Sequence, residues 1–108
     1  MSKDLQRLMD EVSEWQHKTF ESVECVNISR HLEKEAKELT DELNKMAIDS
    51  FSVASEMADC LILLSSCAKR YGFTAEDLIT YSFEKLEINK SRQWGKQNED
   101  GTYTHIEQ

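Results

Sequence analysis

The segment that most constrains the fold of this chain is residues 50–68, in which nearly every side chain is apolar or small. Its only charged residues are Glu56 and Asp59, which are three positions apart. A helix that is apolar nearly all round is usually buried, and this spacing places both carboxylates on one face of it. Acidic side chains are almost never fully buried without a partner. We therefore expect a core helix whose two carboxylates meet a basic residue or a metal ion.

A second acidic pair lies upstream, where Glu35 and Glu38 are also three residues apart. Helical geometry places them in a strip with His31 and Glu42, beside an apolar stripe formed by Ile28, Leu32, Ala36, Leu39, Leu43 and Met46. Packing of that stripe would bring the strip toward the apolar helix. Four carboxylates from two helices would form a hard-oxygen site that suits Mg²⁺, with Mn²⁺ able to substitute. The pair Glu35 and Glu38 alone would more often be a solvated helix face.

The whole chain favours helix, since its 108 residues include no proline and three glycines. Hydrophobic periodicity predicts helices at about residues 2–20, 27–46, 50–71 and 74–94. The boundary signals are Asn27 or Ser29 for the second helix, Asp49, Ser50 or Ser52 and Gly72 for the third, and Thr74 to Asp77 and Gly95 for the fourth. Residues 96–108 lack periodicity and are expected to be an irregular tail, with a turn at Asp100-Gly101.

These elements predict an all-α bundle of four to five helices that forms a single domain over residues 1–108. The inward face of the fourth helix should contain Leu78, Ile79, Phe83 and Leu86. Four helices of this length leave apolar faces on the first and third that one chain hardly covers. We therefore expect a homo-oligomer, either a dimer or a tetramer.

Charge and cysteine content restrict the partners and the compartment. The formal net charge of −8 disfavours binding to nucleic acid or to an anionic membrane, which require clustered basic residues. The longest apolar run, residues 58–68, is too short to cross a bilayer. The three cysteines show no C-x-x-C spacing, which argues against a disulfide framework or a thiolate zinc site. The expected location is the reducing cytoplasm.

The two acidic pairs together resemble the metal-binding signature of the all-α NTP pyrophosphohydrolase superfamily, E-x-x-E followed by E-x-x-D, here with seventeen residues between the pairs. The resemblance extends to residues 14–20 and 85–94, and so covers most of the chain. The sequence is most similar to the short stand-alone MazG-like proteins of bacteria and phages, including the dATP/dGTP pyrophosphohydrolases. It departs from the frequent E-E-x-x-E form, because Lys34 precedes Glu35.

This resemblance implies Mg²⁺-dependent hydrolysis of a nucleoside triphosphate, expected to be a dNTP, to the monophosphate and pyrophosphate. The reaction would proceed by metal-assisted attack of water on the α-phosphorus. By analogy Glu35, Glu38, Glu56 and Asp59 are the metal ligands. Glu35 and Glu38 are the catalytic candidates, and Glu38 would also orient the water.

Further side chains are candidates for substrate contacts. Lys85, Asn89 and Arg92 follow the spacing i, i+4, i+7 and, with Tyr81, could reach the phosphates, although the helix dipole alone favours basic residues near a helix C-terminus. The candidates for the nucleoside are Trp15, Phe20, Asn27 and His31. Trp15 and Phe20 could stack on a base or pack in the core, Asn27 could cap a helix or contact the sugar and base, and His31 suits a hydrogen-bonding role.

Three alternatives stay open at this point. A non-enzymatic acidic helical interaction protein would bind no Mg²⁺. A di-iron bundle is disfavoured, because neither acidic helix carries the E-x-x-H pair of such sites. A phosphoribosyl-ATP pyrophosphohydrolase or an all-α dUTPase would share the metal signature, because the bound metal contacts the phosphates of a substrate and not its base. The sequence leaves open the base, the sugar and the number of metal ions.

Overall fold

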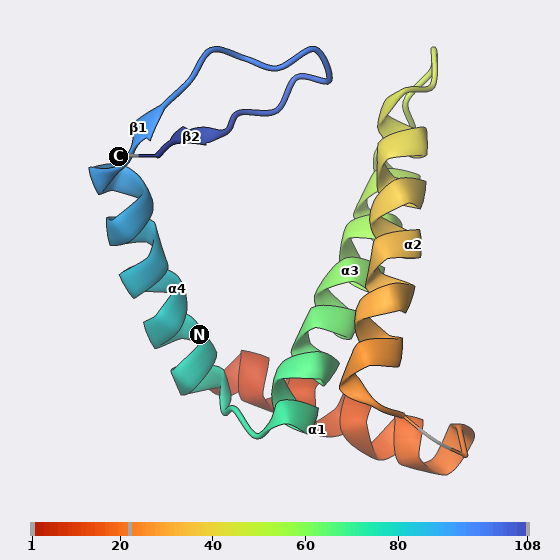
Figure 1. The fold of residues 1–108 in the computed structure, drawn as a ribbon. Helices are drawn as coiled ribbons and strands as arrows, with labels where there is room; N and C mark the ends of the chain where they lie inside the picture. Colours follow the sequence, from red (N-terminus) through yellow and green to blue (C-terminus); the bar gives the residue numbers. More distant parts are fainter. Residues whose placement is uncertain (1, 22, 108) are drawn as a thin grey trace. The chain divides into compact units, whose positions relative to one another are not determined.

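The computed structural model describes residues 2–21 and 23–107, with side chains described from Asp4 onward at the N-terminal end. The described chain forms four helices and a two-stranded sheet (Figure 1). In order these are α1 (Ser2–Thr19), α2 (Cys25–Leu43), α3 (Ser50–Tyr71), α4 (Ala75–Ser91), β1 (Gln93–Trp94) and β2 (His105–Ile106). The expected all-α class is confirmed. The chain forms two compact units, Met1–Leu78 and Ile79–Gln108.

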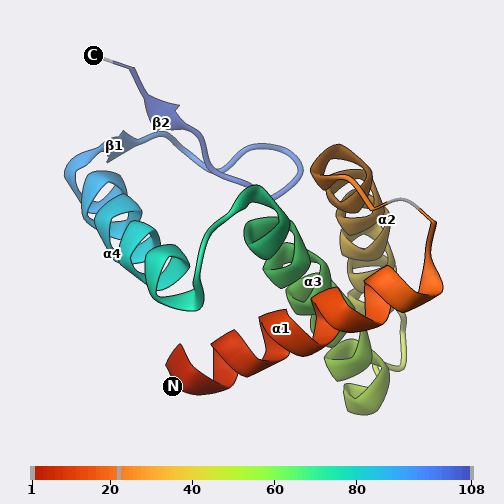
Figure 2. The ribbon, with the colours of Figure 1, turned by 90° about the horizontal axis from the view of Figure 1, so that it is seen from below.

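In the first unit α2 and α3 lie side by side and antiparallel, and α1 runs across them at one end (Figures 1 and 2). The N-terminus of α2 and the last turns of α3 lie at this end. There the thiol of Cys25 lies 3.7 Å from the carbonyl oxygen of Cys67, and the Cys67 thiol lies 3.9 Å from the carbonyl oxygen of Cys25. These reciprocal contacts mark how closely the two helices approach.

The core of this unit is small and lies where α1 meets the end of α3 and the start of α4. Met9, Ala68 and Ala75 are buried there, and Leu5, Phe73 and Leu78 pack against them. Val12, Ile28 and Leu63 are also buried. Several of the buried side chains are polar instead, namely Ser13, Gln16, Ser65 and Ser66. Small serines on α3 let α1 approach closely, and a buried glutamine requires hydrogen-bond partners.

The predicted boundaries of α3 and the start of α4 are confirmed. The Asp49 carboxylate accepts hydrogen bonds from the backbone of Phe51 and Ser52, so it is the N-cap of α3. Gly72 ends the helix at a φ of 111°, a left-handed conformation that glycine adopts without strain. Thr74 and Asp77 form reciprocal hydrogen bonds of 2.9 and 3.1 Å, a capping box with aspartate in place of glutamate.

The predicted boundaries of α2 are wrong at both ends. Glu24 precedes its first residue and makes no side-chain cap hydrogen bond, while Ser29 bonds the carbonyl oxygen of Val26 inside the first turn. Asn27 also lies inside that turn. The helix ends at Leu43, because the next residues form a turn, and Met46 is therefore fully exposed and does not extend the apolar stripe.

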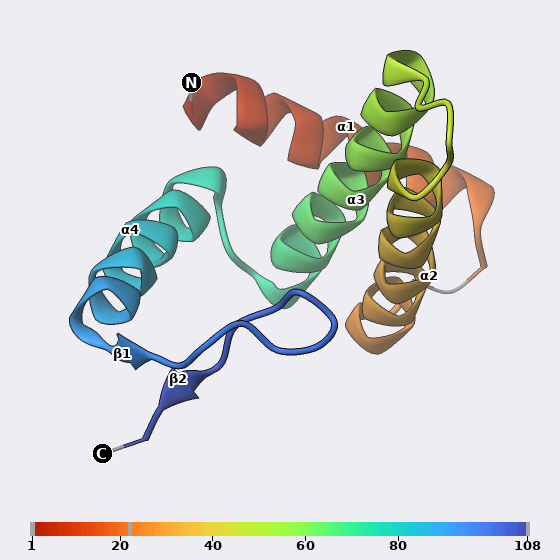
Figure 3. The same cartoon turned by 90° about the horizontal axis from the view of Figure 1, so that it is seen from above.

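The second unit ends in a hairpin that replaces the last turn predicted for α4 (Figure 3). The helix stops at Ser91, and β1 pairs antiparallel with β2 in the register Gln93 to Ile106 and Trp94 to His105. The tail predicted to be irregular thus contains a strand. The turn at Asp100-Gly101 is confirmed: Gly101 has a φ of 89°, and the Asp100 carboxylate accepts the backbone N–H of Thr102 at 3.0 Å.

Apolar side chains are widely exposed on the described helices. Phe83, predicted to face inward, is 67% exposed, and Ile79 and Leu86 are also exposed. On α3 the exposed apolar side chains include Phe51, Met57, Leu61 and Leu64.

The full length of α3 is also apolar enough to resemble a membrane-crossing helix, unlike residues 58–68 taken alone. Core helices of soluble proteins share that property. Glu56 and Asp59 stand in the middle of α3, where charged side chains are costly inside a bilayer.

Candidate metal centre

The two acidic pairs converge between α2 and α3 within one chain. Oxygen atoms of Glu35, Glu38 and Glu56 all lie within 4.8 Å of one another. Asp59 belongs to the same group of charges, because its negative charge raises the pKa of both Glu35 and Glu56. The antiparallel packing of two helices, each carrying its pair on one face, produces this cluster. The convergence expected from the sequence is therefore present, while the role of each residue as a ligand stays a prediction.

Crowding of negative charge perturbs the ionisation of the cluster. The pKa of Glu35 is raised to about 7, first by its side-chain hydrogen bond with Glu38, then by desolvation and by the charges of Glu38 and Asp59. The pKa of Glu56 is also raised, mainly by desolvation. Without a cation, a proton shared among these carboxylates relieves part of the repulsion.

The oxygen atoms of the cluster are poorly satisfied by the protein alone. Oε2 of Glu35 and Oε2 of Glu56 are buried and have no hydrogen-bond partner. The nearest basic group to Glu35 among the described ion pairs is His31, whose Nε2 lies 3.3 Å from Oε1 of Glu35. Buried carboxylate oxygens without donors are expensive unless a cation coordinates them. Together with an all-oxygen donor set, these two orphaned atoms fit a hard divalent ion such as Mg²⁺ or Mn²⁺.

Glu42, the third acidic member of the α2 strip, does not join the cluster. Its Oε1 lies 2.6 Å from Nζ of Lys45, an ion pair within the same helical end. Among the described residues, the carboxylates that lie within 4.8 Å of one another are those of Glu35, Glu38 and Glu56, and Glu42 is not one of them. Glu42 is thus a partly buried helix residue whose charge is neutralised by Lys45, and it offers a matched control for Glu38.

An apolar pocket of about 170 Å³ adjoins the carboxylates. Its lining is Trp15, Gln16, Phe20, His31, Glu35, Asp59, Ile62 and Leu63. A second pocket, of about 190 Å³, shares four of these residues and adds Val23, Asn27 and Ile28. Of the four side chains predicted to contact the nucleoside, Trp15, Phe20 and His31 therefore line the pocket that includes Glu35 and Asp59, and Asn27 lines the second pocket.

The two aromatic residues of this pocket are arranged as a pair. The rings of Trp15 and Phe20 make an edge-to-face contact with centroids 5.5 Å apart. Both side chains are about half exposed, at 54% and 48%, so neither is a core residue. An aromatic face beside a carboxylate cluster suits a ligand that combines a flat ring with a metal-bound anion.

Gln16 is a pocket residue that was not predicted to contact a ligand. It is 4% exposed, lines both pockets and accepts a hydrogen bond from the Ser66 hydroxyl on α3. A sequence signal was present, because Gln16 continues the buried stripe of α1 four residues after Val12. A polar side chain on the buried face of a helix often indicates a binding site.

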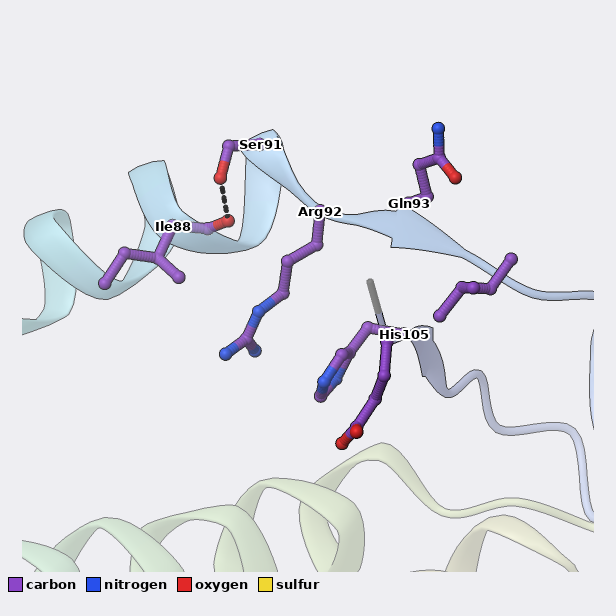
Figure 4. A pocket seen from close by; sticks show the side chains of 7 residues that line it. Ile88, Ser91, Arg92, Gln93 and His105 are labelled. Carbon is purple, nitrogen blue, oxygen red and sulfur yellow. Dashed lines mark hydrogen bonds between the residues drawn. The ribbon is translucent and has the colours of Figure 1, made fainter.

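The predicted phosphate contacts lie in the second unit. Tyr81, Lys85 and Asn89 line a shallow surface depression on α4. Arg92 lies one residue beyond the end of α4, which corrects its predicted place on the helical strip, and its Nη1 donates to Oδ1 of Asn89 at 3.2 Å. The Arg92 side chain projects into a pocket that His105 also lines (Figure 4). Their contact with substrate stays a prediction.

Comparison with known proteins places these features in a family. Residues 8–108 match the family described as dATP/dGTP pyrophosphohydrolase. A solved structure, titled "Cyanophage S-2L MazG-like pyrophosphohydrolase bound to dGDP and three catalytic Mn2+ ions per active site", is similar with a TM-score of 0.72 and 25% sequence identity. The similarity covers 96% of this chain and 94% of that one. A search of curated proteins found no match.

Proposed function

Because the chain belongs to the dATP/dGTP pyrophosphohydrolase family, we propose that it hydrolyses a purine deoxynucleoside triphosphate between the α and β phosphates. The products are the deoxynucleoside monophosphate and pyrophosphate. The main support for the proposal is the cluster of Glu35, Glu38 and Glu56, whose carboxylate oxygens lie within 4.8 Å of one another. In this cluster Oε2 of Glu35 and Oε2 of Glu56 are buried and accept no hydrogen bond. The phage relative binds dGDP and Mn²⁺, which supports both the substrate class and the need for a divalent metal.

The proposed ligands of Mg²⁺ are Glu35, Glu38, Glu56 and Asp59, with Mn²⁺ as a substitute. When bound, the cation supplies neutralisation of the phosphate oxygens and lowers the pKa of coordinated water. Glu35 and Glu56 are suited to hold it, since each keeps an unpaired buried oxygen. Asp59 lies at the boundary with the apolar pocket and would hold the edge of the site nearest the nucleoside.

Glu38 is proposed to position the attacking water. It is the most exposed member of the three-residue cluster, so it is the carboxylate that solvent reaches most easily. Its hydrogen bond with Glu35 restricts the orientation of both carboxyl groups. The two therefore act together: Glu35 fixes the geometry within the cluster, while Glu38 orients a water toward the α-phosphorus.

The proposed nucleoside site is the apolar pocket, where Trp15 and Phe20 present aromatic surface and His31 and Asn27 present polar groups. The proposed phosphate contacts are Tyr81, Lys85, Asn89 and Arg92. Arg92 is held by its hydrogen bond to Asn89, which limits the freedom that its guanidinium would lose on binding an anion.

We further propose that the enzyme is a cytoplasmic homo-oligomer, a dimer or a tetramer. Met57, Leu61 and Leu64 recur at helical spacing on α3 and are each about half exposed. A contiguous apolar face of this kind on a helix is typical of a surface buried by another subunit. A second copy of the chain supplies the same face, as a symmetric interface requires.

The test is pyrophosphate release from a panel of dNTPs and NTPs with Mg²⁺, comparing the wild type with Glu38→Gln and Glu42→Gln. Loss of the Glu38 carboxylate is expected to lower kcat by a factor on the order of 10² to 10⁴. The Glu42 variant should retain wild-type activity, because its carboxylate pairs with Lys45 outside the cluster. Release of pyrophosphate from none of the triphosphates, or equal activity of the two variants, would contradict the proposal.

A further inference from the structure

Gln16 is the buried polar side chain that both nucleoside pockets share and that the proposed chemistry does not use. Its side chain comes from α1, and Ser66, which donates to its Oε1, comes from α3 fifty residues away in the chain. Ser66 has no exposed surface, and Gln16 is 4% exposed. A hydrogen bond between two buried groups fixes the plane and the direction of the amide.

The amide nitrogen of Gln16 is the hydrogen-bond donor that this side chain can offer to a ligand. Nε2 donates to no acceptor among the described residues, whereas Oε1 accepts from the buried hydroxyl of Ser66. Gln16 lines both pockets, so its amide lies at their wall.

We infer that Gln16 is a specificity-determining residue, and that it favours guanine over adenine by donating from Nε2 to the base. This inference rests on the proposed function. Guanine presents two acceptors, O6 and N7, on one edge, whereas adenine presents the N7 acceptor beside the N6 amino donor. A free glutamine amide can match adenine with its donor and its acceptor together. Here the hydrogen bond from Ser66 holds Oε1 toward α3 and leaves the Nε2 donor for the ligand, so the adenine amino group would meet a second donor.

Ser66 acts as a positioning residue in this scheme, because it touches Gln16 and not the base. Ser65 offers a matched control. It is the adjacent residue of α3, it is equally buried, and its Oγ has no hydrogen-bond partner. Removing the hydroxyl of Ser65 therefore changes the same helix without releasing the amide.

The experiment measures kcat/KM for dGTP, dATP, dITP and 7-deaza-dGTP with Mg²⁺ in the wild type, Gln16→Leu, Ser66→Ala and Ser65→Ala. Ratios between substrates within one variant are compared, because a general loss of folded enzyme cancels in the ratio. The wild type should prefer dGTP to dATP roughly tenfold. It should accept dITP as well as dGTP, since hypoxanthine keeps O6 and N7, and it should lose activity on 7-deaza-dGTP, which lacks N7.

Gln16→Leu should bring the four substrates to similar values, and Ser66→Ala should raise the ratio of dATP to dGTP, while Ser65→Ala should leave every ratio unchanged. Calorimetric binding of dGMP and dAMP to the same proteins should follow the same order without turnover. A wild type that prefers dATP or ignores the loss of N7 overturns the inference, even where the variants do not fold. Ratios that are identical in wild type, Gln16→Leu and Ser66→Ala also overturn it, with the proposed function intact. Absence of pyrophosphate release from all substrates instead refutes the proposed function.

Discussion

Metal binding should release protons from this protein, and the raised pKa of Glu35 sets the amount. With a pKa of about 7, the Glu35 carboxyl of the metal-free protein is about half protonated at pH 7. By the same relation it is about nine-tenths protonated at pH 6 and about one-tenth at pH 8. A carboxylate must be ionised to coordinate a cation. Binding should therefore release about half a proton from Glu35 at pH 7, and Glu56, whose pKa is raised too, adds to this.

The assay is calorimetric titration with Mn²⁺ at pH 6, 7 and 8 in pairs of buffers that differ in ionisation enthalpy. The dependence of the observed heat on the buffer gives the protons released. The apparent affinity should also fall by about tenfold for each unit of pH below 7, since one proton is then displaced per ion. The control is Glu42→Gln, which should reproduce the wild-type values because Glu42 pairs with Lys45. No proton release at pH 6 and 7, with binding intact, would refute the shared-proton cluster.

The same pKa shift predicts how the stability of the metal-free protein depends on pH. A carboxyl whose pKa rises from 4.5 to about 7 on folding keeps, in the folded chain, a proton that the unfolded chain has already lost. The free energy of unfolding should therefore fall as the pH rises through this window. Saturating Mg²⁺ should remove the decline, because the ion then takes the place of the proton. Urea denaturation at pH 5, 6, 7 and 8 with and without Mg²⁺ measures both effects.

The remaining predictions concern stability and assembly. Glu56→Gln should raise the thermal midpoint of the metal-free protein, since it removes one charge from a crowded cluster. The same variant should be stabilised less by Mg²⁺, and an unchanged response to Mg²⁺ would exclude Glu56 as a ligand. Leu61→Lys should shift the protein toward monomer in light scattering, because Leu61 is exposed on the apolar face of α3; a monomeric wild type would refute the interface. Thr74→Ala should cost about 1 kcal/mol in urea denaturation by removing the Thr74 half of the capping box, and a loss near zero would contradict that role.

Much of the fold was predictable because the signals that begin and end helices are local. The cap at Asp49, the left-handed Gly72 and the box between Thr74 and Asp77 each involve residues within three positions of a helix end. Where the local signal was ambiguous the prediction was wrong. Asparagine is a residue type that often caps helices, so Asn27 was predicted to precede α2. The helix instead begins at Cys25 without a side-chain cap, and Asn27 lies inside it.

The hairpin after α4 was not predictable from its own residues. Each strand has two residues, too few to show alternation, and what stabilises them is pairing with partners eleven and thirteen positions away. The indole N–H of Trp94 donates to the carbonyl oxygen of Asn89 at 3.0 Å, and its ring packs edge-to-face on His105. These contacts end α4 at Ser91, three residues before the predicted end.

By itself the sequence determined that two helices each carry an acidic pair on one face, since the geometry of a helix makes residues three apart neighbours whatever surrounds them. Tertiary structure decided what those pairs became. Antiparallel packing of α2 on α3 brought Glu56 and the charge of Asp59 to the pair on α2. The pKa of Glu35 rises to about 7 through its hydrogen bond with Glu38, through burial, and through the charges of Glu38 and Asp59, so the neighbouring helix contributes to a shift that begins within α2. It also joined Gln16 to Ser66 across fifty residues. Ionisation and hydrogen bonding depend on neighbours in space, and only the packed chain specifies those neighbours.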